Sequence, residues 1–478
     1  MAANSTMAIA RVALPKGRML AQTAELLNAS GLGFADYNSK TRIYRMQSDT
    51  VPGLIAKMLN ERDIPVQVAI GNYDFGICSS DWLQELLLRY PSSRVYKLAD
   101  LDYDLNSIYM ACHAGAFLTQ DDITGSINDW RIVTEYPALA ESAAFRMRLK
   151  RFRIFPLWGS ANAYPPENAD LAVLRSTGDE ELHSMNLRAV RRICGSNACI
   201  IANRDRLESV DLSPMLAYFS KMINRQAGNR KNAEKMVAPV QKDKVYRPSE
   251  HKLWLALADG HQQVHTLNFL EKTGIKFQGY SPDNLQRRPA SSIDWLNTKV
   301  IRPQDMPQQV ANGNFDLAIT GSDWLLDHLC QFPSSPVEKL LDLGFGRVRI
   351  VAVVAEAVPA NSIEDIKELI AKGKMKTLRI ASEYINTADR YLRDKHIQRY
   401  RVIPTWGATE VYLPEDADIL IENTETGQTL ARHKLKIIDT LFESTACLIG
   451  NSRSLSLPHK RGKIDKLVSI FREAIASQ

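Results

Sequence analysis

The sequence predicts an α/β protein made of two tandem copies of one unit, with mostly parallel sheets. Three observations carry this prediction. The chain repeats itself over nearly its whole length, short apolar runs alternate with helix-like segments, and 478 residues exceed what a single core organises. Apolar content of 45% and charged content of 24% are typical of a soluble globular protein. The formal charge of +6 suits anionic small molecules and does not require nucleic acid.

The repeat is visible as blocks that return 242 to 248 residues later. The clearest pairs are 151–170 (RFRIFPLWGSANAYPPENAD) with 399–418 (RYRVIPTWGATEVYLPEDAD), 74–83 (DFGICSSDWL) with 316–325 (DLAITGSDWL), 63–65 with 305–307, and 196–203 with 444–451. A period this long indicates duplication of a whole pair of domains, not a solenoid repeat.

Strands and helices alternate within the first copy. The expected strands are 9–14, 66–70, 74–78, 132–134, 152–156 and 169–174. The expected helices are 19–28, 82–88 and 138–148. This order predicts α/β layers, in which ligands bind outside the carboxyl ends of the strands.

The two copies are expected to occupy 8–223 and 252–478, joined by a polar and basic linker at 224–251. Six scattered cysteines without a CxxC pair predict reduced structural thiols, and the histidines show no metal-ligand spacing. The N-terminus lacks the pattern of a signal peptide, and no apolar run is long enough to span a membrane. We therefore expect a cytoplasmic protein without membrane or nucleic-acid partners.

Residues 418–430 (DILIENTETGQTL) organise the functional hypothesis. An apolar strand ends in Glu422, a small polar loop follows, and a helix begins. Backbone N–H groups, hydroxyls and the helix dipole make such a loop suitable for a phosphate. Ordinary capping of a helix is the alternative interpretation of the same residues.

Several blocks resemble the ATP phosphoribosyltransferases, the first enzymes of histidine biosynthesis. The matching blocks are 11–18 (RVALPKGR), 313–323 (GNFDLAITGSD), 342–349 (DLGFGRVR), 407–411 (GATEV) and 417–430. The resemblance covers nearly the whole chain, twice, in the family's order.

The resemblance implies that each copy folds like a type II periplasmic binding protein, with two lobes flanking a cleft. Lobe I is then expected at 8–104 plus 192–223 and at 252–348 plus 438–478, and lobe II at 105–191 and 349–437. It also implies the short form of the family, whose usual partner is a regulatory subunit resembling a histidyl-tRNA synthetase.

The implied reaction joins phosphoribosyl pyrophosphate (PRPP) to N1 of ATP and releases pyrophosphate. The residues carried over as catalytic are Arg302, for the pyrophosphate, and Glu422, for the ribose hydroxyls. The residues carried over as substrate-binding are Thr424, Glu425, Thr426, Gly427, Gln428, Thr429 and Leu430 of the phosphate loop, with Glu410, Arg347, Lys16 and Arg18. Mg²⁺ is expected to arrive with PRPP, without metal ligands from the protein.

The two copies have diverged at these positions. Asp259-Gly260-His261 stands where the first copy has Lys16-Gly17-Arg18, and Asn60 stands where the second has Arg302. The first-copy loop, 174–181, carries three acids and is expected to repel phosphate. We therefore expect a degenerate first copy, a working site mainly in the second, and packing of the two copies as an internal pseudo-dimer.

Three alternatives stay open. The acceptor differs from ATP, or the chain is a non-catalytic ligand-binding or regulatory relative, or Lys16 and Arg18 of the first copy complete the second-copy site. Association of pseudo-dimers into a homo-oligomer is also left open. An extracellular solute-binding protein shares the implied fold but requires a signal sequence.

Overall fold

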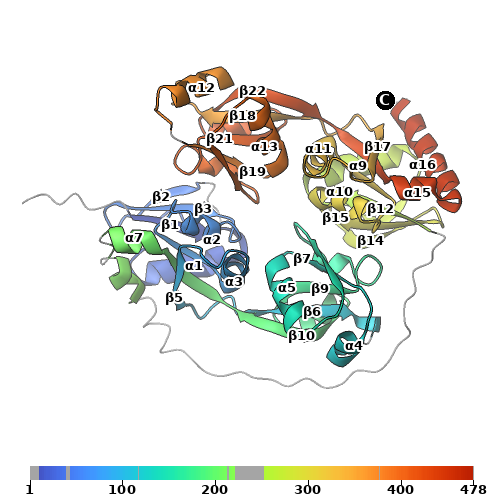
Figure 1. Cartoon of the computed structure of the whole chain (residues 1–478), viewed down its shortest axis with the longest axis horizontal. Helices are drawn as coiled ribbons and strands as arrows, with labels where there is room; N and C mark the ends of the chain where they lie inside the picture. The colour runs from blue at the N-terminus through green and yellow to red at the C-terminus, as the bar shows by residue number, and fades with distance from the viewer. Residues whose placement is uncertain are drawn as a thin grey trace, which may run out of the picture.

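Four α/β lobes, two from each copy, make up the part of the chain that the computed structural model describes (Figure 1). The described residues are 10–38, 43–116, 118–210, 212, 215–220, 252–375 and 377–476. The basic linker expected at 224–251 lies outside them. No helix in the described ranges combines the length and the apolar character needed to cross a bilayer.

Lobe I of the first copy is a six-stranded sheet in the order β2-β3-β1-β4-β11-β5. Strand β1 is parallel to β3 and β4, whereas β11 is antiparallel to β4 and β5. Its elements are β1 (Ala10–Pro15), α1 (Leu20–Ala29), β2 (Arg45–Gln47), β3 (Leu54–Leu59), α2 (Ile64–Ala69), β4 (Phe75–Ser79), α3 (Ser80–Arg89), β5 (Val95–Asp100), β11 (Ala198–Asn203) and α7 (Arg204–Ser209).

Lobe II of the first copy is a five-stranded sheet in the order β10-β6-β9-β7-β8. Strand β7 is parallel to β8 and β9, and β6 is antiparallel to β9 and β10. Its elements are β6 (Asn106–His113), α4 (Gln120–Gly125), β7 (Trp130–Thr134), α5 (Pro137–Arg146), β8 (Phe152–Pro156), β9 (Leu171–Ser176), α6 (Asp179–Ser184) and β10 (Leu187–Ser196).

The second copy repeats this plan. Its lobe I has the strand order β15-β12-β16-β23-β17 and its lobe II the order β20-β19-β21-β18-β22. Lobe I consists of β12 (Leu253–Ala258), α9 (His261–Lys272), the hairpin of β13 (Phe277–Tyr280) and β14 (Leu285–Ser291), β15 (Leu296–Ile301), α10 (Met306–Ala311), β16 (Leu317–Gly321), α11 (Ser322–Gln331), β17 (Val337–Asp342), β23 (Ala446–Asn451), α15 (Ser452–Ser456) and α16 (Pro458–Ala476). Lobe II consists of β18 (Val348–Ala355), α12 (Ile363–Ala371), β19 (Leu378–Ser382), α13 (Ile385–Asp394), β20 (Tyr400–Pro404), β21 (Ile419–Thr424), α14 (Gln428–Arg432) and β22 (Leu435–Ser444).

The tandem two-lobed α/β prediction is confirmed. The sheets are mixed, because the returning strands β11 and β23 run antiparallel in lobe I and the first strands β6 and β18 run antiparallel in lobe II. The strand expected at 66–70 is wrong, because helix α2 covers Ile64–Ala69. Proline in the first turn of α2 favours a helix start, which outweighs the strand preference of Val66 and Val68.

The predicted lobe boundaries at 191/192 and 437/438 are also wrong. Strands β10 and β22 continue in lobe II to Ser196 and Ser444 before the chain crosses back. Their partners β6 and β18 extend over the same register, so the second crossing follows directly after these long strands.

The two copies lie antiparallel, and each lobe packs against the other kind of lobe from the other copy (Figure 1). One shared apolar core joins lobe I of the first copy to lobe II of the second, for example through Ile64 and Tyr412. Another joins lobe II of the first copy to lobe I of the second, through Tyr164 and Phe315. The expected pseudo-dimer is therefore held together by buried apolar surface.

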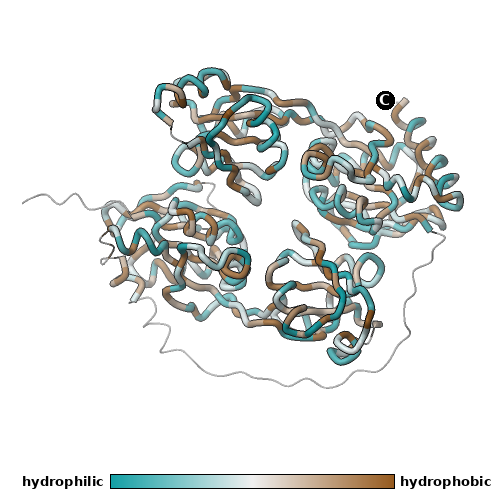
Figure 2. Tube along the Cα trace, viewed as in Figure 1, coloured by the Kyte–Doolittle hydropathy of each residue, from teal (hydrophilic) through white to brown (hydrophobic). Residues whose placement is uncertain are grey.

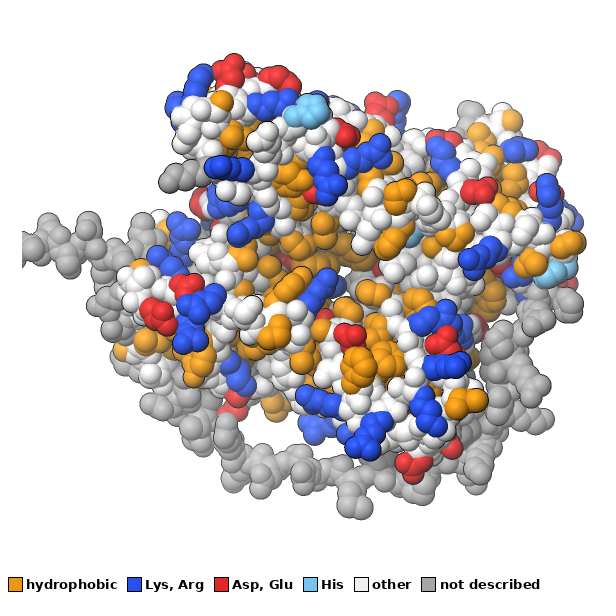
Figure 3. Space-filling model, viewed as in Figure 1, with side chains coloured by type: hydrophobic (Ala, Val, Ile, Leu, Met, Phe, Trp, Pro, Cys, Tyr) orange, Lys and Arg blue, Asp and Glu red, His pale blue; other side chains and the backbone are white. Residues whose placement is uncertain are grey.

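Hydropathy along the chain agrees with these cores. The central strands are largely hydrophobic and the outer helices are mixed (Figure 2). On the face shown in Figure 3, hydrophobic side chains gather where the two copies meet, with lysines and arginines distributed around them. Trp158 and Trp406, equivalent residues of the two copies, meet at this boundary with ring centroids 6.0 Å apart.

Candidate functional site

The phosphate-loop candidate follows β21 at the carboxyl end of that strand. The hydroxyl of Thr424 accepts a hydrogen bond from the Gly427 N–H over 3.0 Å, and Thr426 Oγ1 accepts one from the Gln428 N–H over 3.4 Å. Gly427 has φ +78°, and no heavy atom lies within 4 Å of the place where a Cβ would stand. A ligand oxygen can therefore approach the backbone closely here. Leu430 is buried and anchors the helix that follows, whereas Glu425 is exposed.

Three carboxylates lie beside this loop in lobe II of the second copy. Burial, reinforced by the charges of Glu410 and Glu383, raises the pKa of Glu422 to about 8. Glu422 Oε2 is shielded from solvent and has no hydrogen-bond partner among the described residues. Burial also raises the pKa of Glu383 to about 7, opposed by a hydrogen bond from the Gly407 backbone and by the charge of Lys16. Glu422 is therefore protonated at neutral pH and able to donate a hydrogen bond.

Lys16 comes to this cluster from the other copy. A Cβ added to Gly407 would lie 3.9 Å from Lys16 Nζ and 3.6 Å from Glu383 Oε1. The turn beside Lys16 also contacts the second copy: Asn60 Nδ2 donates to the Trp406 carbonyl over 3.0 Å. The candidate site is therefore composite, with one wall from lobe I of the first copy and the other from lobe II of the second.

Arg302 lies near the middle of the molecule. Its Nη1 atom is 3.6 Å from Asp259 Oδ1, and its Nε atom is 3.3 Å from the place where a Cβ on Gly159 would stand. Burial raises the pKa of Glu135 and of Glu383, and the charge of Arg302 opposes both shifts. The guanidinium is within electrostatic reach of equivalent acids in both copies, and its side chain is 45% exposed.

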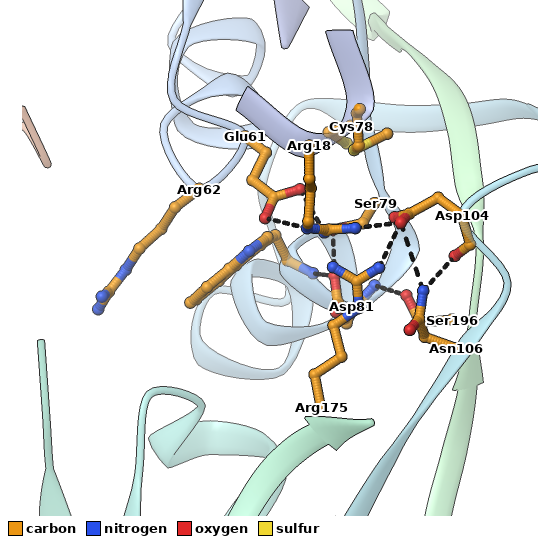
Figure 4. A network of polar contacts seen from close by, with 12 residues as sticks. Arg18, Glu61, Arg62, Cys78, Ser79, Asp81, Asp104, Asn106, Arg175 and Ser196 are labelled. Carbon is orange, nitrogen blue, oxygen red and sulfur yellow. Dashed lines mark hydrogen bonds and ion pairs between the residues drawn. The ribbon is translucent and has the colours of Figure 1, made fainter. Parts of the chain in front are cut away.

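Two of the expected anion-binding residues are engaged with acids. Arg18 donates to Glu61 and Asp104 inside the first-copy cleft, so it does not join Lys16 at the composite site (Figure 4). Arg347 pairs with Glu443, and its side chain is 71% exposed. Arg347 directly precedes β18. In the sheet, Arg349 of β18 stands opposite Thr424 of β21, so Arg347 lies at the edge of the phosphate-loop candidate.

The corresponding loop of the first copy is filled by its own carboxylate. Glu181 Oε2 accepts hydrogen bonds from the Thr177 N–H over 2.7 Å, from Thr177 Oγ1 over 2.8 Å and from Ser176 Oγ over 3.2 Å. These bonds, the Thr177 amide foremost, lower the pKa of Glu181 and keep it ionised. An internal anion thus uses the donors that a phosphate would need.

The comparisons with known proteins decide the family. The model of the ATP phosphoribosyltransferase (HisG) family matches residues 60–224 and 302–473, one match in each copy. The chain belongs to the ATP phosphoribosyltransferase family.

Curated relatives in the family each align with a stretch of this chain that is about as long as one copy. The protein named ATP phosphoribosyltransferase from Prosthecochloris aestuarii is 34% identical over 232 residues, which cover 48% of this chain and 74% of that protein. The one from Chlorobium chlorochromatii is 35% identical over 228 residues, covering 47% and 71%. A solved complex, the HisG:HisZ ATP phosphoribosyl transferase from Thermotoga maritima, aligns with a TM-score of 0.39 and 23% identity over 47% of this chain and all of that one.

The family resemblance did not single out Glu383. A signal for it exists in the sequence, because Ser382-Glu383-Tyr384 repeats Thr134-Glu135-Tyr136 at the end of an equivalent strand. An acid directly after a buried strand in both copies indicates a position at the sheet edge where ligands bind.

Proposed function

We propose that this chain transfers the phosphoribosyl group of PRPP to N1 of ATP and releases pyrophosphate, at the composite site beside the 424–430 loop. The observation that carries the proposal is the contrast between the two loops. Glu181 takes the donors of the first-copy loop, whereas no described carboxylate takes that place in the second. Family membership supplies the reaction class.

In the proposed reaction, a bond forms between adenine N1 and C1 of the ribose while the bond from C1 to the pyrophosphate oxygen breaks. Positive charge develops on the sugar and negative charge on the leaving group. Arg302 and Lys16 would hold the pyrophosphate, and the acids of the cluster would stabilise the sugar. Protonated Glu422 would donate to one ribose hydroxyl and accept from the other.

The phosphate loop would hold the 5′-phosphate of PRPP. Apart from the Gln428 N–H, which donates to Thr426 Oγ1, the N–H groups of the first turn of α14 have no acceptors within the helix, and the hydroxyls of Thr426 and Thr429 add donors. Mg²⁺ would enter with PRPP as part of the substrate. The described residues hold no group of three or more His, Cys, Asp or Glu side chains arranged to bind a metal.

A transferase that uses another acceptor is the second candidate. The observation that favours it is Asp259, which stands beside Arg302 at the position where the first copy has a lysine. This acid beside Arg302 makes the region less favourable for the triphosphate of ATP. A regulatory subunit stays a prediction from the sequence.

The experiment is to incubate the full chain with PRPP, ATP and Mg²⁺ and to follow pyrophosphate release. Thr429→Ala should weaken PRPP binding, whereas Thr177→Ala, at the plugged loop, should leave it unchanged. A PRPP-dependent rise in melting temperature without turnover would contradict ATP as the acceptor and retain PRPP binding. If the chain shows neither turnover nor a PRPP-dependent rise in melting temperature, that result would contradict a transferase and favour a non-catalytic relative.

A further inference from the structure

We propose that the ion-pair network in the first-copy cleft positions Lys16 for catalysis at the site shared with the second copy. The network consists of Arg18, Glu61, Asp104 and Arg175 (Figure 4). This inference rests on the proposed function, and it assigns a role to a cleft that holds no open phosphate loop of its own.

The network ties together four separate segments of the first copy. Arg18 makes a two-point contact with Glu61, with Nε to Oε1 at 3.2 Å and Nη2 to Oε2 at 2.5 Å, and it also donates to Asp104. Arg175, on β9 of lobe II, donates to the same Oδ1 of Asp104 over 2.5 Å. Arginine forks fix the orientation of the groups that they join. The loop after β1 is thereby fixed to the turn after β3, to the crossing between the lobes and to lobe II.

Lys16 is linked to this network through the backbone. Only Gly17, with φ +76°, separates Lys16 from Arg18, and the Lys16 N–H donates to the Leu59 carbonyl over 2.9 Å. The turn that follows β3 begins directly after Leu59, and this turn contacts the second copy. Tyr412 donates through its hydroxyl to Asp63 Oδ2 over 3.0 Å. The brace between Arg18 and Glu61 therefore joins the loop that carries Lys16 to the turn that contacts the opposite wall of the site.

The second copy lacks every member of this network. The structurally equivalent positions, set by the matching strand registers, are His261, Pro303, Gly346 and Asn423. Asn423 instead donates to the Tyr384 hydroxyl over 2.9 Å. The position equivalent to Lys16 is Asp259, which has no cation to present. Among the described residues, the network thus occurs only in the copy that places a lysine beside Glu383 and Gly407 of the other copy.

The burial of the network fits a positioning role. The side chains of Asp104 and Arg175 are 11% and 15% exposed, and Arg175 Nε also lies 4.0 Å from Asp81 Oδ2. Because ion pairs with little exposure lose a large interaction when one partner is removed, a single substitution should loosen the loop. Misplacing a catalytic group by about 1 Å can cost about a hundredfold in rate.

The test compares Arg175→Gln with a matched control, Arg131→Gln. Arg131 lies in the same lobe and pairs with Asp170 over 2.9 Å without contact to the network, and its side chain is 28% exposed against 15% for Arg175. Lysine amines of the full chain are reductively methylated with ¹³C, and the NMR signal of Lys16 is identified by its loss in Lys16→Arg. The kcat and KM for PRPP are measured on unmethylated protein by pyrophosphate release.

We expect Arg175→Gln to shift the Lys16 signal and to lower kcat/KM for PRPP by about tenfold, whereas Arg131→Gln does neither. In the double variant, Arg175→Gln should lower kcat/KM for PRPP no further than Lys16→Gln alone does, because both substitutions act through the ammonium group of Lys16. An unmoved Lys16 signal, or losses that add in the double variant, would overturn the inference. If Arg175→Gln does not fold, Glu61→Gln replaces it with the same expectations. Absence of turnover in the unmutated chain would contradict the proposed function, while the Lys16 signal would still decide the positioning role.

Discussion

Lys57 of the first copy reaches into the second and donates to Asp416 Oδ2 over 2.7 Å, with both side chains almost fully buried. The pseudo-equivalent Lys299 of the second copy reaches back to the first and donates to Asn168 Oδ1 over 2.6 Å. Each lysine also donates to a backbone carbonyl in the turn that it enters, at Val411 and at Tyr164. The two copies are thus joined by a buried polar contact on each side of the pseudo-two-fold axis, in addition to the shared apolar cores.

Lys57→Met should destabilise the chain by about 3 kcal/mol, because it leaves the carboxylate of Asp416 buried without its cation. Lys299→Met should cost less, because the acid beside Lys299, Glu167, keeps Arg288 as a partner. Urea unfolding followed by tryptophan fluorescence measures both values. If the two substitutions lower the free energy of unfolding equally, the cost of Lys57→Met does not come from leaving Asp416 without a cation.

Gly427→Ala should weaken PRPP binding and also lower stability by about 1 kcal/mol, the cost of a left-handed conformation for alanine. The added methyl group meets no protein atom within 4 Å and would stand where the phosphate approaches. Gly313→Ala is the matched control, since Gly313 has φ +76° and equally open surroundings away from the loop. Both variants should lose similar stability, but only the first should lose the PRPP-dependent rise in melting temperature.

Glu181→Gln should leave PRPP binding unchanged and reduce stability by no more than about 1 kcal/mol, the net value of the hydrogen bonds that it weakens. The isosteric amide still fills the first-copy loop, and Asp179 and Glu180 keep the region acidic. Isothermal titration with PRPP and thermal unfolding test this. A second PRPP site appearing in the variant would show that the first copy is blocked by this one charge.

Glu422→Gln should change how stability depends on pH. Between its ordinary value near 4.5 and about 8, Glu422 is protonated in the folded chain and ionised in the unfolded chain, so the unmutated protein loses stability as pH rises through this range. The variant should therefore be more stable than the unmutated chain at pH 8, by at least about 1.4 kcal/mol, the free energy of a one-unit pKa shift. The difference should shrink toward pH 5. Parallel stability curves would show that Glu422 has an ordinary pKa.

The repeat, the α/β class and the strands β1, β4, β7, β8 and β9 were predictable from sequence, because buried strands impose their own periodicity and the duplication displays each element twice, whereas β2, β3, β5, β6, β10 and β11 were not predicted. Helix α2 was not, because Val66 and Val68 favour a strand locally while Pro65 and the packing of the turn favour a helix. The residues at which the chain passes from lobe II back to lobe I were also not predicted, since β10 and β22 carry no residue that marks where one sheet ends.

For the candidate site, the difference between the 424–430 loop and the acidic first-copy loop was visible in sequence as a change in charge. What sequence could not show is that Lys16 and Arg18, two residues apart, contact different parts of the structure, Lys16 beside the second copy and Arg18 within the first. Their separation follows from Gly17, whose positive φ turns the chain between them, and from partners at Glu61, Asp104 and Gly407 that are far away in sequence. Such partnerships depend on the pairing of the copies, which local patterns do not encode.

The duplication places both halves of the pair on one chain, and this changes what a single mutation does. In a symmetric homodimer every substitution appears twice, once on each side of the axis, so a lysine gained at one site is gained at both. Here Lys16 has no counterpart on the opposite side, and Asp259 stands in its place. In the function proposed above, covalent joining of the copies lets the first copy support the site of the second without a matching site of its own, an arrangement closed to two identical subunits.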